Sequence, residues 1–225
     1  MIAIVQARMN STRLPGKVLR SINGKPMLLR VVENLRKSLL IKQIIIATSK
    51  SSRDIKIENF CRKNKLEFFK GDLKDVSNRF KNLLEQNKYY HKSFLRISSD
   101  SPLIDYKLVD RCIRIFKKKK PNILTNVFPR TFPKGQSIEI INSRFFLKNQ
   151  TKFISPQDKE HVTHFFYRKK FKKILNIRNQ INYSSLNMCV DTYNDLKKMR
   201  LFFKKINTKR KLNQMNWVNL VRHFS

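Results

Sequence analysis

A basic loop follows the first apolar segment of the chain and carries the side chain types that bind phosphate. It reads Ala7-Arg8-Met9-Asn10-Ser11-Thr12-Arg13-Leu14-Pro15-Gly16-Lys17. The cations are Arg8, Arg13 and Lys17, and the hydroxyls are those of Ser11 and Thr12. An arginine fork binds phosphate oxygens bidentately, and a lysine adds a point charge. We therefore expect a triphosphate site rather than a merely exposed basic loop, although neither GxxxxGK[ST] nor GxGxxG is present.

Two aspartates follow later apolar segments in the same way. Asp100 comes after the segment 93–98, and Asp191 comes after Cys189-Val190. Ligands of open parallel sheets bind at the carboxyl ends of the strands, so both carboxylates are expected to face one cleft. Two carboxylates suffice for Mg²⁺ when phosphate oxygens and water complete its octahedron. The alternative for either is a helix N-cap, the role we expect for Asp105, while Asp195 fits the first turn of a helix.

Alternating apolar patterns supply the elements that position these residues. Strands are predicted over 2–6, 43–48, 66–69, 93–98 and 186–190, with another within 135–141. Helices are predicted over 27–35, 54–63, 76–84, 108–116, 157–168 and 196–203. This β-α repetition predicts an α/β fold whose mainly parallel sheet is covered on both faces. With only four glycines, at 16, 24, 71 and 135, the chain is expected to keep them where the backbone needs them.

Composition narrows the class of protein. The chain has 225 residues, of which 40% are hydrophobic and 29% charged, values that suit one globular domain over 1–225. No apolar stretch approaches the roughly 20 residues of a membrane helix, and no signal peptide is recognisable. Three widely spaced cysteines, Cys61, Cys112 and Cys189, indicate reduced thiols, and we expect a cytoplasmic protein.

The formal net charge of +35 leaves an association with nucleic acid or another polyanion open. Basic runs occur at 117–120, 168–173 and 204–211, each at the end of a predicted element. We interpret them as solvated helix termini rather than as a binding patch, so nucleic acid is not the expected partner. His91, His164 and His223 stand in no motif and are expected to be structural or surface residues.

Residues 2–28 resemble the opening of CMP-Kdo synthetases and acylneuraminate cytidylyltransferases. That opening reads roughly I-x-A-R-x-x-S-x-R-L-P-G-K, followed by I-x-G-K-P-M. The resemblance is strongest to the branch named for spore coat polysaccharide biosynthesis, and it covers nearly the whole chain. Its later marks are Gly71-Asp72 with Asp75-Val76 and Arg79, Arg96-Ile97 with Asp100, Pro102-Leu103-Ile104-Asp105, Pro133-Lys134-Gly135 with Glu139, Glu160-His161-Val162-Thr163, and Val190-Asp191-Thr192 with Asp195-Leu196.

The resemblance implies a single-domain nucleotide-diphospho-sugar transferase fold of the GT-A-like, Rossmann-like kind. It also implies that CTP and Mg²⁺ are required and that the protein is a homodimer. The region 127–185 would then supply the sugar pocket and dimer contacts. The implied nucleotide-binding residues are Ala7, Arg8, Ser11, Arg13, Lys17 and Ser98. Asp100 and Asp191 would hold the metal, and Glu139, Glu160 and His161 would lie toward the sugar.

Some positions depart from the family pattern. Ser99 replaces a common glycine, Ser98 and Ser101 stand where the branch has Thr and Cys, and Gln136-Ser137 replaces Leu-Asp. These changes spare the phosphate loop and affect the expected sugar pocket. The sequence thus predicts CMP transfer from CTP to a sugar, with Lys17, Arg8 and Asp100 as catalytic residues. The alternatives are a glycosyltransferase using a nucleotide sugar, an RNA- or polyanion-binding protein, and an inactive homologue.

Overall fold

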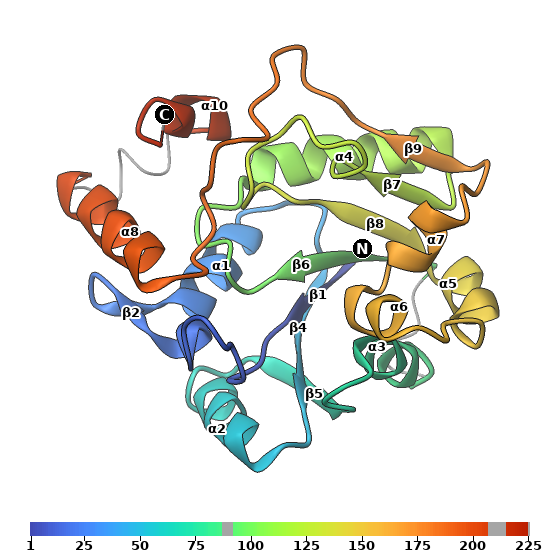
Figure 1. The fold of residues 1–225 in the computed structure, drawn as a ribbon, viewed down its shortest axis with the longest axis horizontal. Coiled ribbons are helices and arrows are strands. Elements are labelled where there is room, and N and C mark those ends of the chain that lie inside the picture. The colour runs from blue at the N-terminus through green and yellow to red at the C-terminus, as the bar shows by residue number, and fades with distance from the viewer. Residues whose placement is uncertain (87–91, 207–214, 225) are drawn as a thin grey trace.

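A seven-stranded sheet organises the computed structural model, which describes residues 1–86, 92–206 and 215–224. The strand order is β5-β4-β1-β6-β8-β7-β9 (Figure 1). Only β8 runs against the other six strands, so the predicted mainly parallel sheet is confirmed. The strands are β1 (Ile2–Gln6), β4 (Gln43–Ser49), β5 (Glu67–Gly71), β6 (Ser93–Ser98), β7 (Ile123–Thr125), β8 (Glu139–Asn142) and β9 (Ile174–Asn176).

Helices cover both faces of the sheet and enclose two apolar cores. Alternating residues of β1 divide between them, since Ala3 and Val5 join one core while Ile2 and Ile4 join the other. The first core receives α1 (Met27–Leu35), α2 (Ile55–Lys63), α4 (Tyr106–Lys119), α8 (Tyr193–Lys205) and α10 (Trp217–Val221). The second is covered by α3 (Val76–Leu84), α5 (Ser143–Gln150), α6 (Pro156–His161) and α7 (His164–Arg168), which are grouped together in Figure 1.

Side-chain caps fix where most of these helices begin. Six helices start after a residue whose side chain accepts a backbone N–H of the first turn: Asp75, Asp105, Asn142, Ser155, Thr192 and Asn216. The predicted cap at Asp105 is confirmed, and its second carboxylate oxygen also accepts from the Trp217 N–H at 3.0 Å. The predicted first-turn acid Asp195 completes a capping box with Thr192.

Three predicted elements differ from the structure. The helix predicted over 157–168 is two short helices, because Val162 has a φ of +52° and interrupts it. The strand expected within 135–141 is confined to β8, which begins at Glu139. The strand predicted over 186–190 is wrong: this extended segment makes only an isolated bridge between Asn187 and Lys134. Several short elements were not predicted: the hairpin of β2 (Ser21–Ile22) and β3 (Lys25–Pro26), the strands β7 and β9, and the helices α5 and α10.

The basic runs lie mostly at helix ends, as predicted. Lys117, Lys118 and Lys119 occupy the last turn of α4, where cations interact favourably with the helix dipole. Lys204 and Lys205 end α8, while residues 207–211 of that run lie outside the described residues, as does His91. No helix in the described ranges is long and apolar enough to cross a membrane. All three cysteines are free thiols, and burial raises the pKa of Cys61 and Cys112 to about 12.

Candidate functional site

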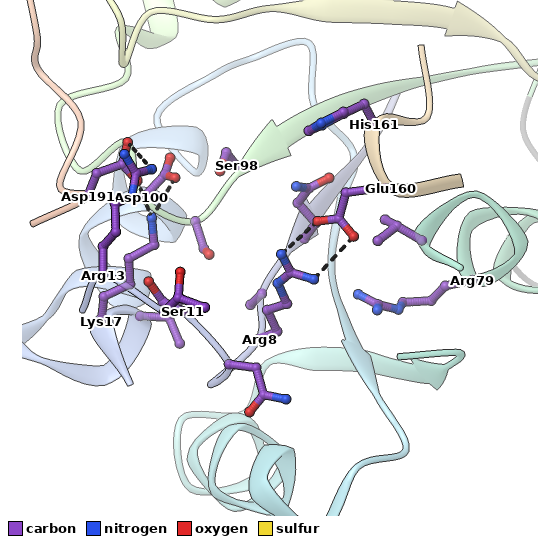
Figure 2. A pocket seen from close by; sticks show the side chains of 17 residues that line it. Arg8, Ser11, Arg13, Lys17, Arg79, Ser98, Asp100, Glu160, His161 and Asp191 are labelled. Carbon is purple, nitrogen blue, oxygen red and sulfur yellow. Dashed lines mark hydrogen bonds and ion pairs between the residues drawn. The ribbon is translucent and has the colours of Figure 1, made fainter. Parts of the chain in front are cut away.

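A cleft of about 380 Å³ opens at the carboxyl ends of β1 and β6. These strands are parallel neighbours, so the loops that follow them lie side by side. Figure 2 shows the side chains that line the cleft. They include every predicted site residue except Glu139: Ala7, Arg8, Ser11, Arg13, Lys17, Ser98, Asp100, Glu160, His161 and Asp191.

The predicted phosphate loop, residues 7–17, is closed by its own backbone and is hydrogen-bonded to the segment before α2. The Gly16 N–H donates to the Met9 carbonyl at 3.0 Å, and Gly16 has a φ of +68°, a conformation that glycine adopts without strain. The Ser11 hydroxyl accepts from the Leu14 N–H at 3.3 Å, and a hydroxyl that accepts can also donate its own proton. The buried Asp54 carboxylate accepts from the Met9 N–H at 2.7 Å. The loop is therefore shaped before any ligand binds.

The two predicted metal ligands are brought together by a backbone hydrogen bond. The Val190 N–H donates to the Asp100 carbonyl at 2.9 Å, which joins the segment before α8 to the end of β6. The Asp195 carboxylate of the capping box accepts from the Asp191 N–H at 3.1 Å and fixes that residue at the start of α8. Asp100 and Asp191 thus face the same end of the cleft although 91 positions separate them in the chain.

Lys17 lies between these carboxylates. Its Nζ is 2.9 Å from Asp100 Oδ2 and 2.7 Å from Asp191 Oδ1, and only 13% of its side chain is exposed. Burial alone would lower the pKa of the ammonium, but Asp100 and Asp191 hold it above its ordinary value. Arg13, which is 65% exposed, adds a contact of 3.2 Å to the second oxygen of Asp191.

The positions of Asp100 and Asp191 indicate whether Mg²⁺ fits the site. Two carboxylates already converge on a single cationic nitrogen, so a divalent ion would find two hard anionic donors there. In the described part of the chain, no cluster of three or more His, Cys, Asp or Glu side chains could hold a metal without further ligands. This donor set suits Mg²⁺ bound together with phosphate oxygens, provided that Lys17 leaves the carboxylates.

Arg8 and Glu160 form a bidentate ion pair across the cleft. The Arg8 guanidinium nitrogens lie 2.6 and 3.2 Å from the two Glu160 oxygens, with 40% and 31% of the side chains exposed. A phosphate ligand of Arg8 therefore has to compete with Glu160. His161, the next residue, also faces the cleft (Figure 2). Desolvation and the nearby Arg96 cation lower the pKa of His161, so its imidazole is mainly neutral at pH 7.

Glu139 lies beneath the cleft instead of lining it. It is 4% exposed and forms an ion pair with Arg96, and it also accepts hydrogen bonds from Thr163 Oγ1, at 2.7 Å, and from the Tyr167 hydroxyl. The same Thr163 hydroxyl lies 3.1 Å from the His161 carbonyl. Glu139 therefore supports the turn that presents Glu160 and His161, and it touches no open part of the cleft.

That turn is strained. Val162 is fully buried, and a positive φ is rare for a β-branched residue. Such conformations persist where surrounding contacts impose them, often at functional sites. The Thr163 hydroxyl supplies one such contact, and Asp158 of α6 supplies others to His164 at 2.8 Å and Arg168 at 2.8 Å. Burial would raise the pKa of Asp158, but hydrogen bonds from His164, Arg168 and Ser155 hold it below its ordinary value.

Two buried charged residues at the site, Asp54 and Arg79, were not among the predicted site residues. Asp54 anchors the phosphate loop, and nothing in its sequence context distinguishes it from an ordinary helix-start residue. Arg79 lines the cleft from α3 and is 1% exposed. A signal for Arg79 was present, because it lies three residues after Val76 and four before Leu83, on the apolar stripe of the helix.

The departures from the family pattern have simple local environments. Ser99 is 4% exposed and lines the cleft, and its N–H donates to the Gln6 carbonyl at 3.2 Å. The Ser137 hydroxyl accepts from Arg130 at 3.0 Å. Gln136 is fully buried and connects the Asp105 N–H with the Leu103 carbonyl. These contacts keep the β7–β8 segment packed against the end of β6.

Comparison with known proteins agrees with this geometry. A family model described as cytidylyltransferase matches residues 2–221. The spore coat polysaccharide biosynthesis protein SpsF of Bacillus subtilis is 27% identical over 91% of this chain and 87% of its own length. A 3-deoxy-manno-octulosonate cytidylyltransferase of Francisella philomiragia is 32% identical over 56% of this chain and 50% of its own.

Solved structures extend the likeness to three dimensions. A cytidylyltransferase from Leptospira borgpetersenii superposes with a TM-score of 0.89 at 27% identity, covering 98% of this chain and 92% of that one. A CMP:2-keto-3-deoxy-manno-octonic acid synthetase complexed with CTP has a TM-score of 0.69 at 15% identity, with 91% and 98% covered. The second likeness shows the fold alone.

Proposed function

The chain belongs to the cytidylyltransferase family, and from this premise we propose that it transfers CMP from CTP to a hydroxyl of a sugar. The sugar is proposed to be a sugar acid, and the product a precursor of a surface polysaccharide. Two relatives support this choice: one is named for spore coat polysaccharide biosynthesis and another for 3-deoxy-manno-octulosonate. A cytoplasmic homodimer is proposed with it, in which the region 127–185 supplies sugar and dimer contacts.

The observation that carries the proposal is the convergence of a shaped cationic loop and two carboxylates on one cleft. The three cationic side chains of the loop, Arg8, Arg13 and Lys17, face three carboxylates in the cleft lining, those of Asp100, Glu160 and Asp191. A nucleoside triphosphate brings several negative charges, which the cations offset. Once Lys17 turns to the phosphates, Asp100 and Asp191 can bind a further cation that arrives with the nucleotide, as Mg²⁺ does in a magnesium nucleotide.

The proposed reaction is an in-line displacement at the α-phosphorus of CTP. A sugar hydroxyl oxygen forms a bond to this phosphorus while the bond to the pyrophosphate oxygen breaks, and the hydroxyl proton passes to solvent. Pyrophosphate leaves toward Lys17 and Arg13, whose charges offset the charge it gains. Arg8 exchanges Glu160 for a phosphate oxygen, which leaves Glu160 available to a sugar hydroxyl beside the neutral His161.

Asp100 and Asp191 are the proposed ligands of Mg²⁺. When bound, the ion supplies charge neutralisation at the phosphate oxygens. Lys17 then transfers its hydrogen bonds from the carboxylates to the pyrophosphate. The displaced ammonium thus remains within the cleft and serves the leaving group.

Thermal unfolding with nucleotides provides the first test. We expect CTP with Mg²⁺ at 100 times its dissociation constant to stabilise the purified protein by about 2.7 kcal/mol relative to the unliganded protein. UTP, GTP and ATP at the same concentration should stabilise it less. Pyrophosphate release is then measured with CTP and a panel of sugar acids. Equal, salt-sensitive shifts with every nucleotide and with RNA would instead reflect the net charge of +35 and would refute the proposal.

A further inference from the structure

Arg79 is the one cation of the cleft lining to which the proposed chemistry assigns no role. Its side chain extends from α3 toward the Arg8–Glu160 pair (Figure 2). It is 1% exposed, whereas Arg8 and Arg13 are 40% and 65% exposed. Charged side chains that are buried this deeply are normally paired or fully hydrogen-bonded, because their transfer from water is costly. The hydrogen-bond partners of the guanidinium are therefore informative.

Those partners are backbone carbonyls, and they do not use all of its N–H groups. Nε and Nη2 donate to the Asp72 carbonyl at 2.8 and 2.6 Å, and Nη2 also reaches the Leu73 carbonyl at 3.3 Å. Among the described residues, Nη1 contacts only the Ala47 carbonyl, at 3.4 Å. A guanidinium has five N–H groups, two of them on Nη1, so this nitrogen keeps a donor for another acceptor. Burial lowers the pKa of Arg79, but an arginine remains charged near neutral pH.

The Ala47 carbonyl places Nη1 beside the phosphate loop. The same oxygen accepts the N–H of Ala7, the first residue of that loop, at 3.1 Å. Ala7 and Val76 also line the cleft and are 2% and 3% exposed. The cleft that Arg79 lines thus also carries small apolar side chains, which suit the faces of a flat ring, while Nη1 offers a donor to its edge.

The backbone of β5 is adapted to this arginine. A Cβ on Gly71 would lie 2.6 Å from Arg79 Cγ and 3.1 Å from its Cα. One of only four glycines in the chain is thus used to let α3 approach the strand at Arg79, although the φ of this glycine is not positive. The Cβ of Arg79 would also lie 3.1 Å away, so glycine at this position allows α3 to pack closely against β5 where Arg79 enters the cleft lining.

We propose that Arg79 is a specificity-determining residue that donates from Nη1 to N3 of the cytosine base of CTP. The assignment rests on the proposed function. The phosphates of CTP are placed at Lys17 and Arg13, and the base then extends along the cleft toward α3. Cytosine presents N3 and O2 as adjacent acceptors, whereas N3 of uracil carries a proton and cannot accept. A fixed guanidinium donor at this position selects CTP over UTP.

The test separates recognition of the base from binding of the phosphates. Isothermal titration is carried out with CTP, UTP and inorganic tripolyphosphate on the wild-type protein and on Arg79→Met and Arg79→Lys. We expect Arg79→Met to weaken CTP about 10- to 100-fold, since a hydrogen bond from a charged group contributes on this scale, and to leave tripolyphosphate binding unchanged. Arg79→Lys keeps a donor and a charge but not the fixed fork, and it should reduce the preference for CTP over UTP by a smaller factor.

A matched control and a ligand analogue make the result decisive. Arg30 also donates to backbone carbonyls, those of Ile22 at 2.9 Å and Asn23 at 3.1 Å, and it does not line the cleft, so Arg30→Met should leave all three affinities unchanged. The triphosphate of 3-deazacytidine, which has C–H at position 3, should bind the wild-type protein about 10-fold more weakly than CTP. This arm needs no variant, so it holds even if Arg79→Met does not fold.

Two results would overturn the assignment. If Arg79→Met weakens tripolyphosphate as much as CTP, the arginine only supports the loop at Asp72. If 3-deazacytidine triphosphate binds as tightly as CTP, N3 is not the acceptor. Failure of the proposed function looks different, because the wild-type protein would then bind tripolyphosphate and all nucleotides alike.

Discussion

Replacing Lys17 by methionine removes the ammonium that joins Asp100 and Asp191 and leaves a side chain of similar length. Two charge-assisted hydrogen bonds, of 2.9 and 2.7 Å, are lost. Removing one partner of a fully buried ion pair is destabilising by about 3–5 kcal/mol, whereas exposed pairs contribute about 0–1 kcal/mol. With 13%, 19% and 31% of the three side chains exposed, we expect about 2 kcal/mol in the presence of a chelator. For a domain of this size, that lowers Tm by about 4–8 °C.

Divalent cations should raise the Tm of the Lys17→Met variant more than that of the wild-type protein. Methionine leaves both carboxylates free and removes a positive charge that repels a metal. Two unit charges about 4 Å apart interact by about 4 kcal/mol at an effective dielectric constant of 20. If the repulsion between Lys17 and a bound metal ion amounts to only a third of that value, its removal raises the affinity for the metal about 10-fold. We therefore expect Lys17→Met to bind Mn²⁺ at least about 10-fold more tightly than the wild-type protein without nucleotide, while turnover falls about 10²- to 10³-fold through loss of the leaving-group contact.

Electron paramagnetic resonance of free Mn²⁺ measures this affinity without requiring activity. The control is Lys25→Met, which removes a lysine paired with Glu33 outside the cleft and should not change Mn²⁺ binding. Equal Mn²⁺ affinities for Lys17→Met and wild-type protein would refute the reasoning. They would mean that Asp100 and Asp191 do not form the metal site, or that Lys17 does not compete for it.

Three further predictions concern single carboxylates. Asp100→Asn should reduce CMP transfer by a factor of about 10² or more in a pyrophosphate-release assay, while its circular dichroism spectrum stays that of the wild-type protein; normal transfer would exclude Asp100 as a metal ligand. Asp54→Ala removes the acceptor of the buried Met9 N–H, so Tm should fall by the equivalent of about 1–3 kcal/mol and tripolyphosphate should bind more weakly in titration calorimetry; unchanged phosphate binding would show that the loop holds its shape without this anchor. Because the folded-state pKa of Asp158 lies below its ordinary value, its contacts stabilise the protein above about pH 4, and this contribution is lost as the pH falls through the folded-state value. In scanning calorimetry from pH 3 to 7, Asp158→Asn should therefore lower Tm near neutrality and flatten its fall with acid, and a parallel acid limb in both proteins would contradict this.

The sequence predicted the first half of the fold well because its elements are long and strongly patterned. The β-branched run of β4 and the helical spacing of α1 leave little ambiguity about element type. β7 and β9 were not predicted, since strands of three residues are too short to display a period. The segment 186–190 is apolar like a strand, but it lies over the end of the sheet, where a single bridge to Lys134 replaces a ladder.

The family and the α/β fold predicted from the sequence motifs are confirmed by the family match and by the solved structures. The assignment of individual site residues stays a prediction. Types and spacing could indicate which side chains reach the cleft, and all but Glu139 do. They could not indicate how these side chains pair with one another. The contacts of Lys17 with two aspartates, and of Arg8 with Glu160, depend on loops that converge only in the folded chain.

The hydrogen bond between Val190 and Asp100 has a consequence for the order in which the molecule is built. On the ribosome, the basic loop is made first and Asp100 follows. Val190 and Asp191, which contact Asp100 and Lys17, emerge only after more than four fifths of these 225 residues have been synthesised. Until then the ammonium of Lys17 has at most one of its two carboxylate partners. A nascent or prematurely terminated chain that lacks residue 191 contains all of β1, β4 and β6, yet it cannot assemble the pair of acids. Under the proposed function, the chain therefore gains its metal site only when the segment before α8 has docked.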